Sequence, residues 1–242
     1  MSEPLVPEPT STVAVFAPMV TELRPFLAPL SLARVPLGDH VVHRGRVGHR
    51  EVIASLAGIG TASAARAAER VLAAYAVDLV IVMGIAGGVD ATLEIGDVIA
   101  PEYVVDNHSG AQFRPAPLGD QPGRGVLVTT DTLFGPAELT DLRARGVVAV
   151  DMETAAIAAV CESKGVAWSV VRSISDHVGD AIVDDAVLGM MRPDGSVAPL
   201  KVMRFLATRP GEIGRLTSLA RGTKLSTKAA AAVTLRACGV PA

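Results

Sequence analysis

Aromatic side chains are scarce in this sequence: Phe, Trp and Tyr make up 3% of 242 residues, although 50% of the residues are hydrophobic. A core of this composition must consist of Val, Ala, Leu and Ile, which suits parallel strands covered by Ala-rich helices. Surfaces that bind nucleic acids combine basic and aromatic residues. This chain has one Trp and a formal net charge of -3. The composition therefore predicts an α/β protein and argues against nucleic acid as a partner.

Cysteine is scarce as well, and long hydrophobic runs are absent. Cys161 and Cys238 form neither a disulfide framework nor a metal-binding pair, and the five histidines also lack metal-ligand spacing. The longest uncharged apolar stretch, around residues 79–89, is too short and too rich in Gly to span a bilayer. Residues 1–11 lack the basic and apolar regions of a signal peptide. We therefore expect a cytoplasmic protein without a metal or another cofactor.

Short apolar runs alternate with helical patterns along most of the chain. Helices are expected at residues 61–75, 136–145 and 153–164. Strands are expected at residues 13–17, 51–57, 77–83, 98–105, 126–130, 147–150 and 167–174. This alternation predicts an α/β domain with a central mixed, mostly parallel sheet flanked by helices.

The two ends of the chain differ from this pattern. Residues 1–12, which contain three prolines, are predicted to be a flexible N-terminal segment before a single domain over residues 13–242. Within that domain, residues 185–242 are predicted to be a basic helical extension. From residue 201 onward, eight Lys or Arg residues stand against the single Glu212. Apolar residues recur every three positions in two runs, 200–206 and 213–219, which predicts a pair of amphipathic helices.

Charged residues follow several of the predicted strands, where ligands bind in open α/β sheets. Glu22 follows the first strand, Asp151 and Glu153 follow the sixth, and Arg172 and Asp176 lie at the end of the last. A buried arginine or aspartate at such a place is costly unless it pairs or serves a ligand. The alternative for Glu22 is a favourable interaction with the helix dipole, and for Asp151 or Glu153 a helix cap.

Two Gly-rich segments, 58–60 and 84–88, also follow predicted strands. They allow a close approach of the backbone to a ligand, or equally tight packing of a strand against its neighbour. The second segment matches neither a phosphate-binding loop nor a dinucleotide fingerprint, and the chain has no GxSxG elbow. Carboxylates at separate strand ends instead favour hydrolysis through an oxocarbenium-like transition state, with one acid protonating the leaving group and another aligning water.

The order and spacing of these motifs over residues 13–180 resemble the methylthioadenosine and adenosylhomocysteine nucleosidases of the purine nucleoside phosphorylase superfamily. The Met-Glu and Arg-x-x-Ser-Asp blocks in combination are specific to that superfamily. The matching motifs are Met19-x-x-Glu22, Gly58-Ile59-Gly60, Gly84-Ile85-Ala86-Gly87-Gly88 followed by Gly96-Asp97-Val98, Asp151-Met152-Glu153-x-Ala155-Ala156, and Val171-Arg172-Ser173-Ile174-Ser175-Asp176.

The resemblance implies a role for each matching residue. Glu22 would orient the attacking water, with Arg172 nearby. Asp176, helped by Ser175, would protonate or hydrogen-bond N7 of the departing purine, which requires a raised pKa near pH 7. The implied substrate-binding residues are Met152 and Glu153 on the ribose, together with Ser175, Gly87, Ile59 and Phe134.

Departures from the family pattern bear on the reaction and the substrate. Ile85 stands where the nucleosidases commonly have Ser, and the Arg and Ser with which the phosphorylases bind phosphate are absent from this loop. Hydrolysis is therefore favoured over phosphorolysis. Leu133 stands where the nucleosidases have a base-stacking Phe, so stacking comes from Phe134 or is lost.

The resemblance favours release of adenine from an adenosine-type nucleoside with a 5' substituent. A phosphate-dependent phosphorylase and a binding protein without turnover stay open as alternatives. The C-terminal region is similar to that of hopanoid-biosynthesis members of the superfamily, so an adenosylhopane nucleosidase is a third. A basic amphipathic end could then lie against an anionic membrane, although a helix pair packed on its own sheet explains the pattern equally. The family also implies a homodimer or larger oligomer, with the loop at residues 106–125 closing a neighbour's site.

Overall fold

The computed structural model describes residues 11–118, 123–132, 134, 136–178 and 213–241. The predicted flexible segment therefore lies almost wholly outside the described residues. The elements in chain order are β1 (Thr12–Ala17), α1 (Val20–Leu27), β2 (Ala33–Leu37), β3 (His40–Val47), β4 (Arg50–Leu56), α2 (Thr61–Ala74), β5 (Leu79–Gly88), β6 (Val98–Ile99), β7 (Tyr103–Asp106), β8 (Gln112–Phe113), β9 (Val126–Thr129), α3 (Pro136–Ala144), β10 (Val147–Asp151), α4 (Thr154–Ser163), β11 (Ala167–His177) and α7 (Ile213–Ala237).

The strands form one mixed sheet in the order β2-β3-β4-β1-β5-β10-β9-β7-β8, while β11 pairs with both β5 and β6. Strands β4, β1, β5 and β11 run parallel to one another, so their carboxyl ends meet at one edge. Antiparallel pairs include β2 with β3 and β10 with the end of β5. The predicted fold class, a single α/β domain with a mixed sheet flanked by helices, is confirmed. The sheet is not mostly parallel, however, because antiparallel pairs are as numerous as parallel ones among the described strands.

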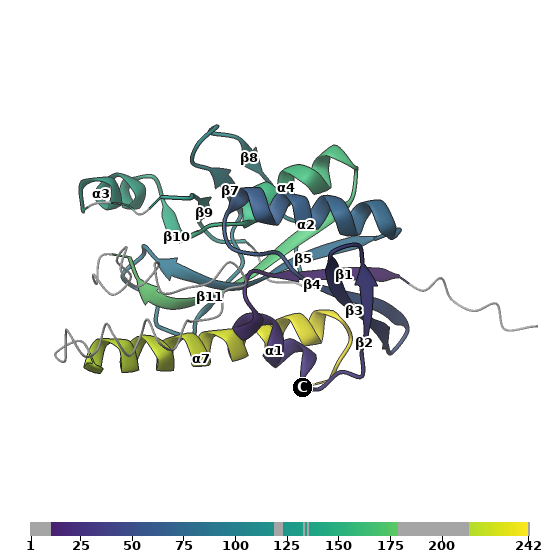
Figure 1. Ribbon diagram of the computed structural model, residues 1–242. Coiled ribbons are helices and arrows are strands. Elements are labelled where there is room, and N and C mark those ends of the chain that lie inside the picture. The colour runs from purple at the N-terminus through teal and green to yellow at the C-terminus, as the bar shows by residue number, and fades with distance from the viewer. Residues whose placement is uncertain (1–10, 119–122, 133, 135, 179–212, 242) are drawn as a thin grey trace, which may run out of the picture.

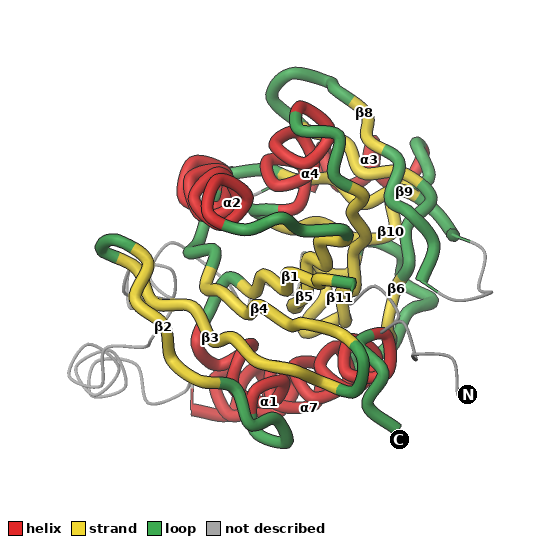
Figure 2. The backbone as a smooth tube through the Cα atoms, turned by 90° about the vertical axis from the view of Figure 1, so that its right-hand side faces the viewer, coloured by secondary structure: helices red, strands yellow, loops and turns green. Residues whose placement is uncertain are grey.

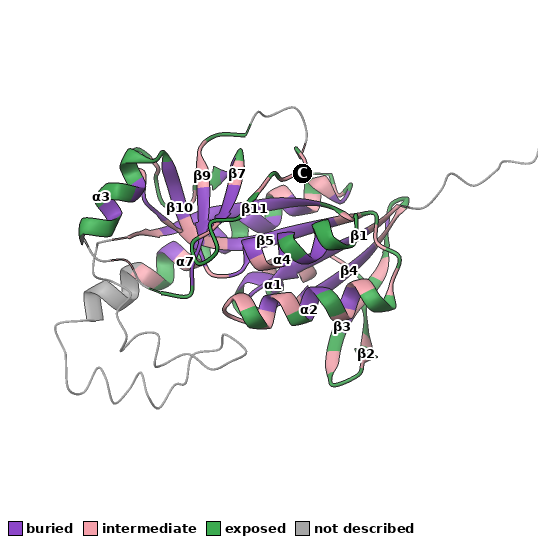
Figure 3. Cartoon of the chain, turned by 90° about the horizontal axis from the view of Figure 1, so that it is seen from above, coloured by how far each residue is buried: buried purple, intermediate pink, exposed green. Residues whose placement is uncertain are grey.

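Helices cover both faces of the sheet (Figures 1 and 2): α2 and α4 lie over one face, and α1 and α7 over the other. Alternate residues of β1 follow this division, because strand side chains point to opposite faces. Ala14 and Phe16 pack in the cluster with α2 and α4, and Val13 and Val15 pack in the cluster with α1 and α7. The central strands are accordingly the most buried part of the chain (Figure 3).

The predicted strand over residues 98–105 is wrong. The segment divides into β6, which pairs with β11, and β7, which pairs with β9. Pro101 lies between them and has no N–H to donate to a ladder. Alternating hydrophobicity alone did not reveal the break.

The antiparallel pair β2 and β3 was not predicted. Its residues are largely exposed or partly exposed, and β3 carries His and Arg among its valines, so it lacks the continuous apolar run of a central strand. The predicted loop over residues 106–125 also contains one short strand, β8, which pairs with β7.

The C-terminal region contains one long helix in its described part. Residues 213–219, predicted to be a helix, form only the beginning of α7, which continues to Ala237. The other predicted helix, around residues 200–206, lies outside the described residues. Ala230, Ala231 and Cys238 belong to the core cluster that includes β1, so α7 and the residues just after it are part of the fold's core. No described helix is long and apolar enough to cross a membrane.

The hydroxyl of Ser226 on α7 donates to the carbonyl of Ile174 on β11, and both residues are buried. We expect Ser226→Ala to lower the free energy of unfolding by about 1 kcal/mol, because a buried hydrogen bond between the two elements is lost. The measurement is urea unfolding followed by the fluorescence of Trp168, the single and buried tryptophan. Ser163→Ala, at an exposed helix end, is the control. Equal losses for the two variants would refute this account.

Candidate active site

The last residues of β5 provide the backbone around which the predicted site residues gather. The N–H of Ile85 donates to Oε2 of Glu22 at 3.0 Å, and the Ile85 carbonyl accepts a hydrogen bond from Nη1 of Arg172 at 3.2 Å. Gly87 pairs with Asp176 in the register between β5 and β11. Strands β5 and β11 are parallel, and Glu22 lies on α1 just after the parallel strand β1, which is why side chains far apart in sequence meet at this edge.

Arg172 is fully buried, with an exposed fraction of 0%, and three carboxylates surround it. Its Nη2 lies 2.6 Å from Oδ2 of Asp151 and 3.2 Å from Oε2 of Glu153, and its Nη1 lies 4.0 Å from Oε2 of Glu22. Its Nε and Nη2 also donate to the hydroxyl of Thr154 at 3.3 and 3.1 Å. This set is called the arginine cluster below.

The arginine cluster holds three acids and one base, all of them buried, and burial is the main reason that the pKa values of two of the acids are raised. Burial raises the pKa of Glu22 to about 8, although the nearby Arg172 opposes the shift. Burial likewise raises the pKa of Glu153 to about 7, again against the pull of Arg172. Burial alone would lower the pKa of Arg172, but attraction from Asp151, Glu153 and Glu22 raises it. Glu22 and Glu153 can therefore change charge near neutral pH.

Gly84 makes the close packing of the arginine cluster possible. A Cβ atom built on Gly84 would overlap Oε2 of Glu22 and Nη1 of Arg172. The two charged side chains therefore pass directly over the backbone of β5. The sequence predicted that this Gly-rich segment lets a ligand or a neighbouring strand come close to the backbone. At Gly84 the groups that come close are side chains of the same chain.

Asp176 lies where the ladder between β5 and β11 is irregular. Ile174 pairs with Ala86 and Asp176 with Gly87, so Ser175 is the extra residue of a bulge. Bulges re-aim side chains beside functional sites. The Ser175 hydroxyl donates to the Asp176 carboxylate, and Oδ2 of Asp176 would lie 3.9 Å from a Cβ built on Gly87. The structure thus brings Ser175, Asp176 and Gly87 together.

The other predicted substrate-binding residues border this region. Gly60 donates its N–H to Oε1 of Glu153 at 3.1 Å, which brings its neighbour Ile59, partly exposed, beside the arginine cluster. Met152 is also partly exposed. Phe134 is partly buried and packs against the third core cluster, with Val150 and Val178 as other partly buried members. Val178 in turn lies against Gly87, because a Cβ built on Gly87 would lie 2.7 Å from Cγ2 of Val178.

Three residues of this region were missed or given another role by the sequence interpretation. For Asp151 the sequence left open a ligand-binding carboxylate or a helix cap, whereas in the structure its carboxylate is the one closest to Arg172. Thr129 and Thr154, whose hydroxyls both donate to Asp151, were not predicted. Glu153 takes the N-cap position of α4 but makes no side-chain capping bond. The signal that could have identified Thr154 is its place three residues after an acidic strand end.

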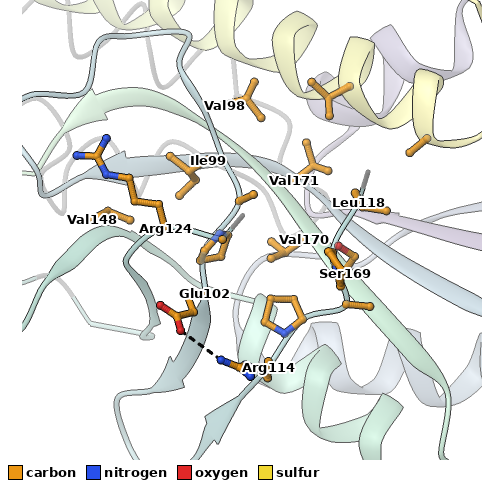
Figure 4. Close-up of a pocket in the computed structure, with 18 of the residues that line it drawn as sticks. Val98, Ile99, Glu102, Arg114, Leu118, Arg124, Val148, Ser169, Val170 and Val171 are labelled. Atoms are coloured by element: carbon orange, nitrogen blue, oxygen red, sulfur yellow. Dashed lines mark hydrogen bonds and ion pairs between the residues drawn. The ribbon is translucent and has the colours of Figure 1, made fainter. Parts of the chain in front are cut away.

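A separate cavity of about 1230 Å³ lies between β11, the chain around β6 and the C-terminal part of α7 (Figure 4). Val170 and Val171 form part of its floor, and Arg114, Arg124 and Glu102 stand around it. None of the predicted site residues lines this cavity. Nothing among the described residues shows what fills it. No described group of three His, Cys, Asp or Glu residues could hold a metal ion.

The chain matches the family model of the phosphorylase superfamily over residues 12–122 and 116–192. The chain therefore belongs to the phosphorylase superfamily, and the resemblance found in the sequence is confirmed. The matched residues include every member of the arginine cluster and Asp176.

Curated relatives and solved structures agree with this assignment. The chain is 30% identical over 168 residues to the 5'-methylthioadenosine/S-adenosylhomocysteine nucleosidase of Tolumonas auensis. The matched residues make up 57% of this chain and 73% of the relative. The chain is 25% identical over 199 residues to the aminodeoxyfutalosine nucleosidase of Helicobacter pylori, with coverage of 69% and 86%. The names of both relatives agree with the predicted enzyme class, an N-glycosyl hydrolase.

The solved structures bear on the fold alone, because their sequence identities are low. The futalosine hydrolase of Helicobacter pylori superposes with a TM-score of 0.71 at 20% identity, over 95% of this chain and 97% of that one. The 5'-methylthioadenosine/S-adenosylhomocysteine nucleosidase of Colwellia psychrerythraea, solved in complex with adenine, gives 0.72 at 19% identity over 96% of both chains.

We expect Gly84→Ala to lower the free energy of unfolding by about 2 to 5 kcal/mol, because the new methyl group displaces a buried ion pair. A double-mutant cycle with Glu22→Ala tests the cause, with urea unfolding as the measurement. Gly84→Ala should cost less in the Glu22→Ala background, where one of the two overlapping side chains is gone. If its cost is the same in both backgrounds, the overlap with Glu22 is not the reason for the glycine.

Proposed function

We propose that this protein hydrolyses the N-glycosidic bond of an adenosine-type nucleoside that carries a 5' substituent, and so releases adenine. The observation that carries the proposal is Oε1 of Glu22, a buried carboxylate oxygen without a hydrogen-bond partner among the described residues. Buried acceptors are normally satisfied, by protein or by ordered water. A water held on Oε1 would lie beside the arginine cluster, at the edge of the sheet that also carries Asp176.

Glu22 has the properties of a base that activates water. Its pKa of about 8 allows the carboxylate to take a proton from an attacking water near neutral pH. Its other oxygen is fixed by the N–H of Ile85, so the carboxylate cannot swing away. Arg172 lies on the same side, where its positive charge favours the ionised form. These features support the role that the family resemblance implies for Glu22.

The departing base needs an acid, and Asp176 is the candidate. Cleavage gives the nitrogen of the base negative charge unless N7 is protonated or receives a hydrogen bond. The Ser175 hydroxyl donates to Asp176 and fixes the orientation of its carboxyl group. Asp176 is partly buried and lies directly after the bulge residue Ser175, where β11 pairs again with β5 at Gly87.

Met152 and Glu153 remain the candidates for the ribose. Glu153 can accept hydrogen bonds from the two vicinal hydroxyl groups of a sugar, because carboxylates are strong acceptors. Two of its existing partners, the Gly60 N–H and Arg172, hold the side chain in place. Met152 offers an apolar thioether for the sugar face.

The surroundings of Arg172 support hydrolysis over phosphorolysis. A phosphate would need the guanidinium as a counter-ion, but Asp151, Glu153 and Glu22 already surround it. Burying a phosphate beside three carboxylates is electrostatically costly, whereas a neutral water meets no such penalty. Assembly as a homodimer or larger oligomer, the peripheral membrane contact and the cytoplasmic location stay predictions.

The proposed function is tested by adenine release from 5'-methylthioadenosine, S-adenosylhomocysteine, aminodeoxyfutalosine, 5'-deoxyadenosine and a long-chain 5'-alkyl adenosine, each with and without inorganic phosphate. We expect release that does not depend on phosphate. Preference for the alkyl compound would favour the adenosylhopane alternative. Release only with phosphate would make the protein a phosphorylase, and binding without release would make it a nucleoside-binding protein.

Asp176→Asn and Glu22→Gln should each lower kcat at least about a hundredfold, because each removes one proton-transfer group. Glu22→Gln should leave the Kd for the nucleoside nearly unchanged, since water, rather than substrate, is its partner. Adenine release and calorimetric binding are the two measurements. Turnover close to wild type in Asp176→Asn would remove Asp176 as the acid.

A further inference from the structure

Asp151 is the most firmly held carboxylate of the arginine cluster. Its Oδ1 accepts a hydrogen bond from the Thr129 hydroxyl at 2.6 Å, and its Oδ2 accepts one from the Thr154 hydroxyl. Oδ2 also lies 2.6 Å from Nη2 of Arg172, the shortest ion-pair distance in the cluster. Thr129 is itself fixed, because its Oγ1 accepts the N–H of Ala155 at 2.9 Å.

We propose that Asp151 is a positioning residue: held by Thr129 and Thr154, it takes up the charge of Arg172 and thereby leaves Glu22 available as a proton acceptor. The inference rests on the proposed function, and it concerns a residue to which that function assigns no contact with the attacking water or the nucleoside. It assigns the neutralisation of Arg172 to Asp151 and the reaction with water to Glu22.

The distances within the cluster support this division. Arg172 is 2.6 Å from Asp151 but 4.0 Å from Glu22, beyond hydrogen-bond distance. Because Coulomb attraction falls with separation, the guanidinium interacts most strongly with Asp151. If Arg172 paired tightly with Glu22 instead, the carboxylate would be held in its ionised form and would be a weaker base.

A helix-capping role alone does not account for Asp151. Its contacts with the N–H of Thr154 are long, at 3.3 and 3.4 Å. The contact with Arg172, which has no part in capping α4, is much shorter, at 2.6 Å. The side chain is therefore placed for Arg172 first and for the start of the helix second.

The effect of Asp151 on Glu22 has a definite sign. Burial is the main reason that the pKa of Glu22 is raised, and the negative charges of Glu153 and Asp151 raise it further, while Arg172 and the N–H of Ile85 lower it. The described Lys and Arg side chains of α7, which packs against α1, are exposed: Arg221, Lys224, Lys228 and Arg236. Removing the negative charge of Asp151 should therefore lower the pKa of Glu22.

The test compares wild type, Asp151→Asn and Thr129→Val in the pH dependence of kcat/KM for adenine release. In wild type the rate should rise with pH as Glu22 ionises, around pH 8. In Asp151→Asn this rising limb of the pH profile should move to lower pH, because the repulsion from Asp151 is lost and Arg172 is free to pair with Glu22. At high pH the kcat of Asp151→Asn should be about tenfold or more below that of wild type, because Arg172 then pairs with Glu22 and makes it a weaker base. Thr129→Val keeps the charge but loosens Asp151, and should lower kcat without a comparable shift of the limb.

Thr234→Val is the matched control, since it removes a buried hydroxyl on α7 that donates to the Ala230 carbonyl instead. It should leave the pH profile unchanged. If Asp151→Asn loses activity while its limb stays where it is in wild type, Asp151 is merely structural and the inference is overturned.

Titration of Glu22 by ¹³C-carboxyl NMR, with the resonance assigned through Glu22→Gln, gives a readout that needs no turnover. Wild type that releases no adenine would refute the proposed function. A lower titration midpoint in Asp151→Asn would still support the role of Asp151, and an unchanged midpoint would overturn it. If Asp151→Asn does not fold, the same titration is made on Thr129→Val. Loosening Asp151 should also lower the titration midpoint of Glu22, by a smaller amount, and an unchanged midpoint in this variant would overturn the inference.

Discussion

The burial of one guanidinium among three carboxylates is the constraint on which the rest of this structure depends. Arg172 has no exposed surface, so its charge must be balanced by side chains of the same chain. Those side chains come from α1, from the end of β10 and from the turn into α4. The relative placement of four elements is thus tied to one charged group. The same arrangement allows two of the carboxylates, Glu22 and Glu153, to change charge near neutral pH. The groups that balance the buried charge of Arg172 are therefore also groups to which the proposed function gives a chemical role.

The end of β5 allows these elements to meet. Parallel pairing of β1 and β11 with β5 brings Glu22 and Arg172 to one edge, and the missing side chain at Gly84 lets them cross the strand. Further along the same strand, the bulge in β11 sets Asp176 opposite Gly87. The proposed water site and the proposed acid therefore stand along one short length of backbone. A substrate bound there would lie between two groups whose separation is set by a strand that is hydrogen-bonded to its neighbours.

Much of this arrangement was predictable from the sequence, and the rest was not, for identifiable reasons. Buried central strands produce long apolar runs, so β1, β4 and β11 were predicted within a few residues. The predicted end of β5 was wrong, because the strand continues through the Gly-rich segment that was expected to follow it, as far as Gly88. The half-exposed hairpin of β2 and β3 has no such run, and Pro101 divided a segment that looked continuous. The charged ends of buried strands identified Glu22 and Arg172 because charge beside a core strand is costly. Thr129 and Thr154 carried no such signal, since a threonine in or after a strand is ordinary; only the fold shows that both donate to Asp151.

The hydrogen bond from Ser226 to the carbonyl of Ile174 joins β11 to a later helix, between two residues that are 52 positions apart in the sequence. During synthesis on the ribosome, the strand that carries Arg172 and Asp176 emerges well before the helix that covers it. Until α7 docks, a nascent chain exposes the apolar face of β5 and β11 to water and to other chains. Chains interrupted between these two elements are therefore expected to be held by chaperones or degraded, and proteolytic clipping of α7 should inactivate the protein although every predicted site residue is still present.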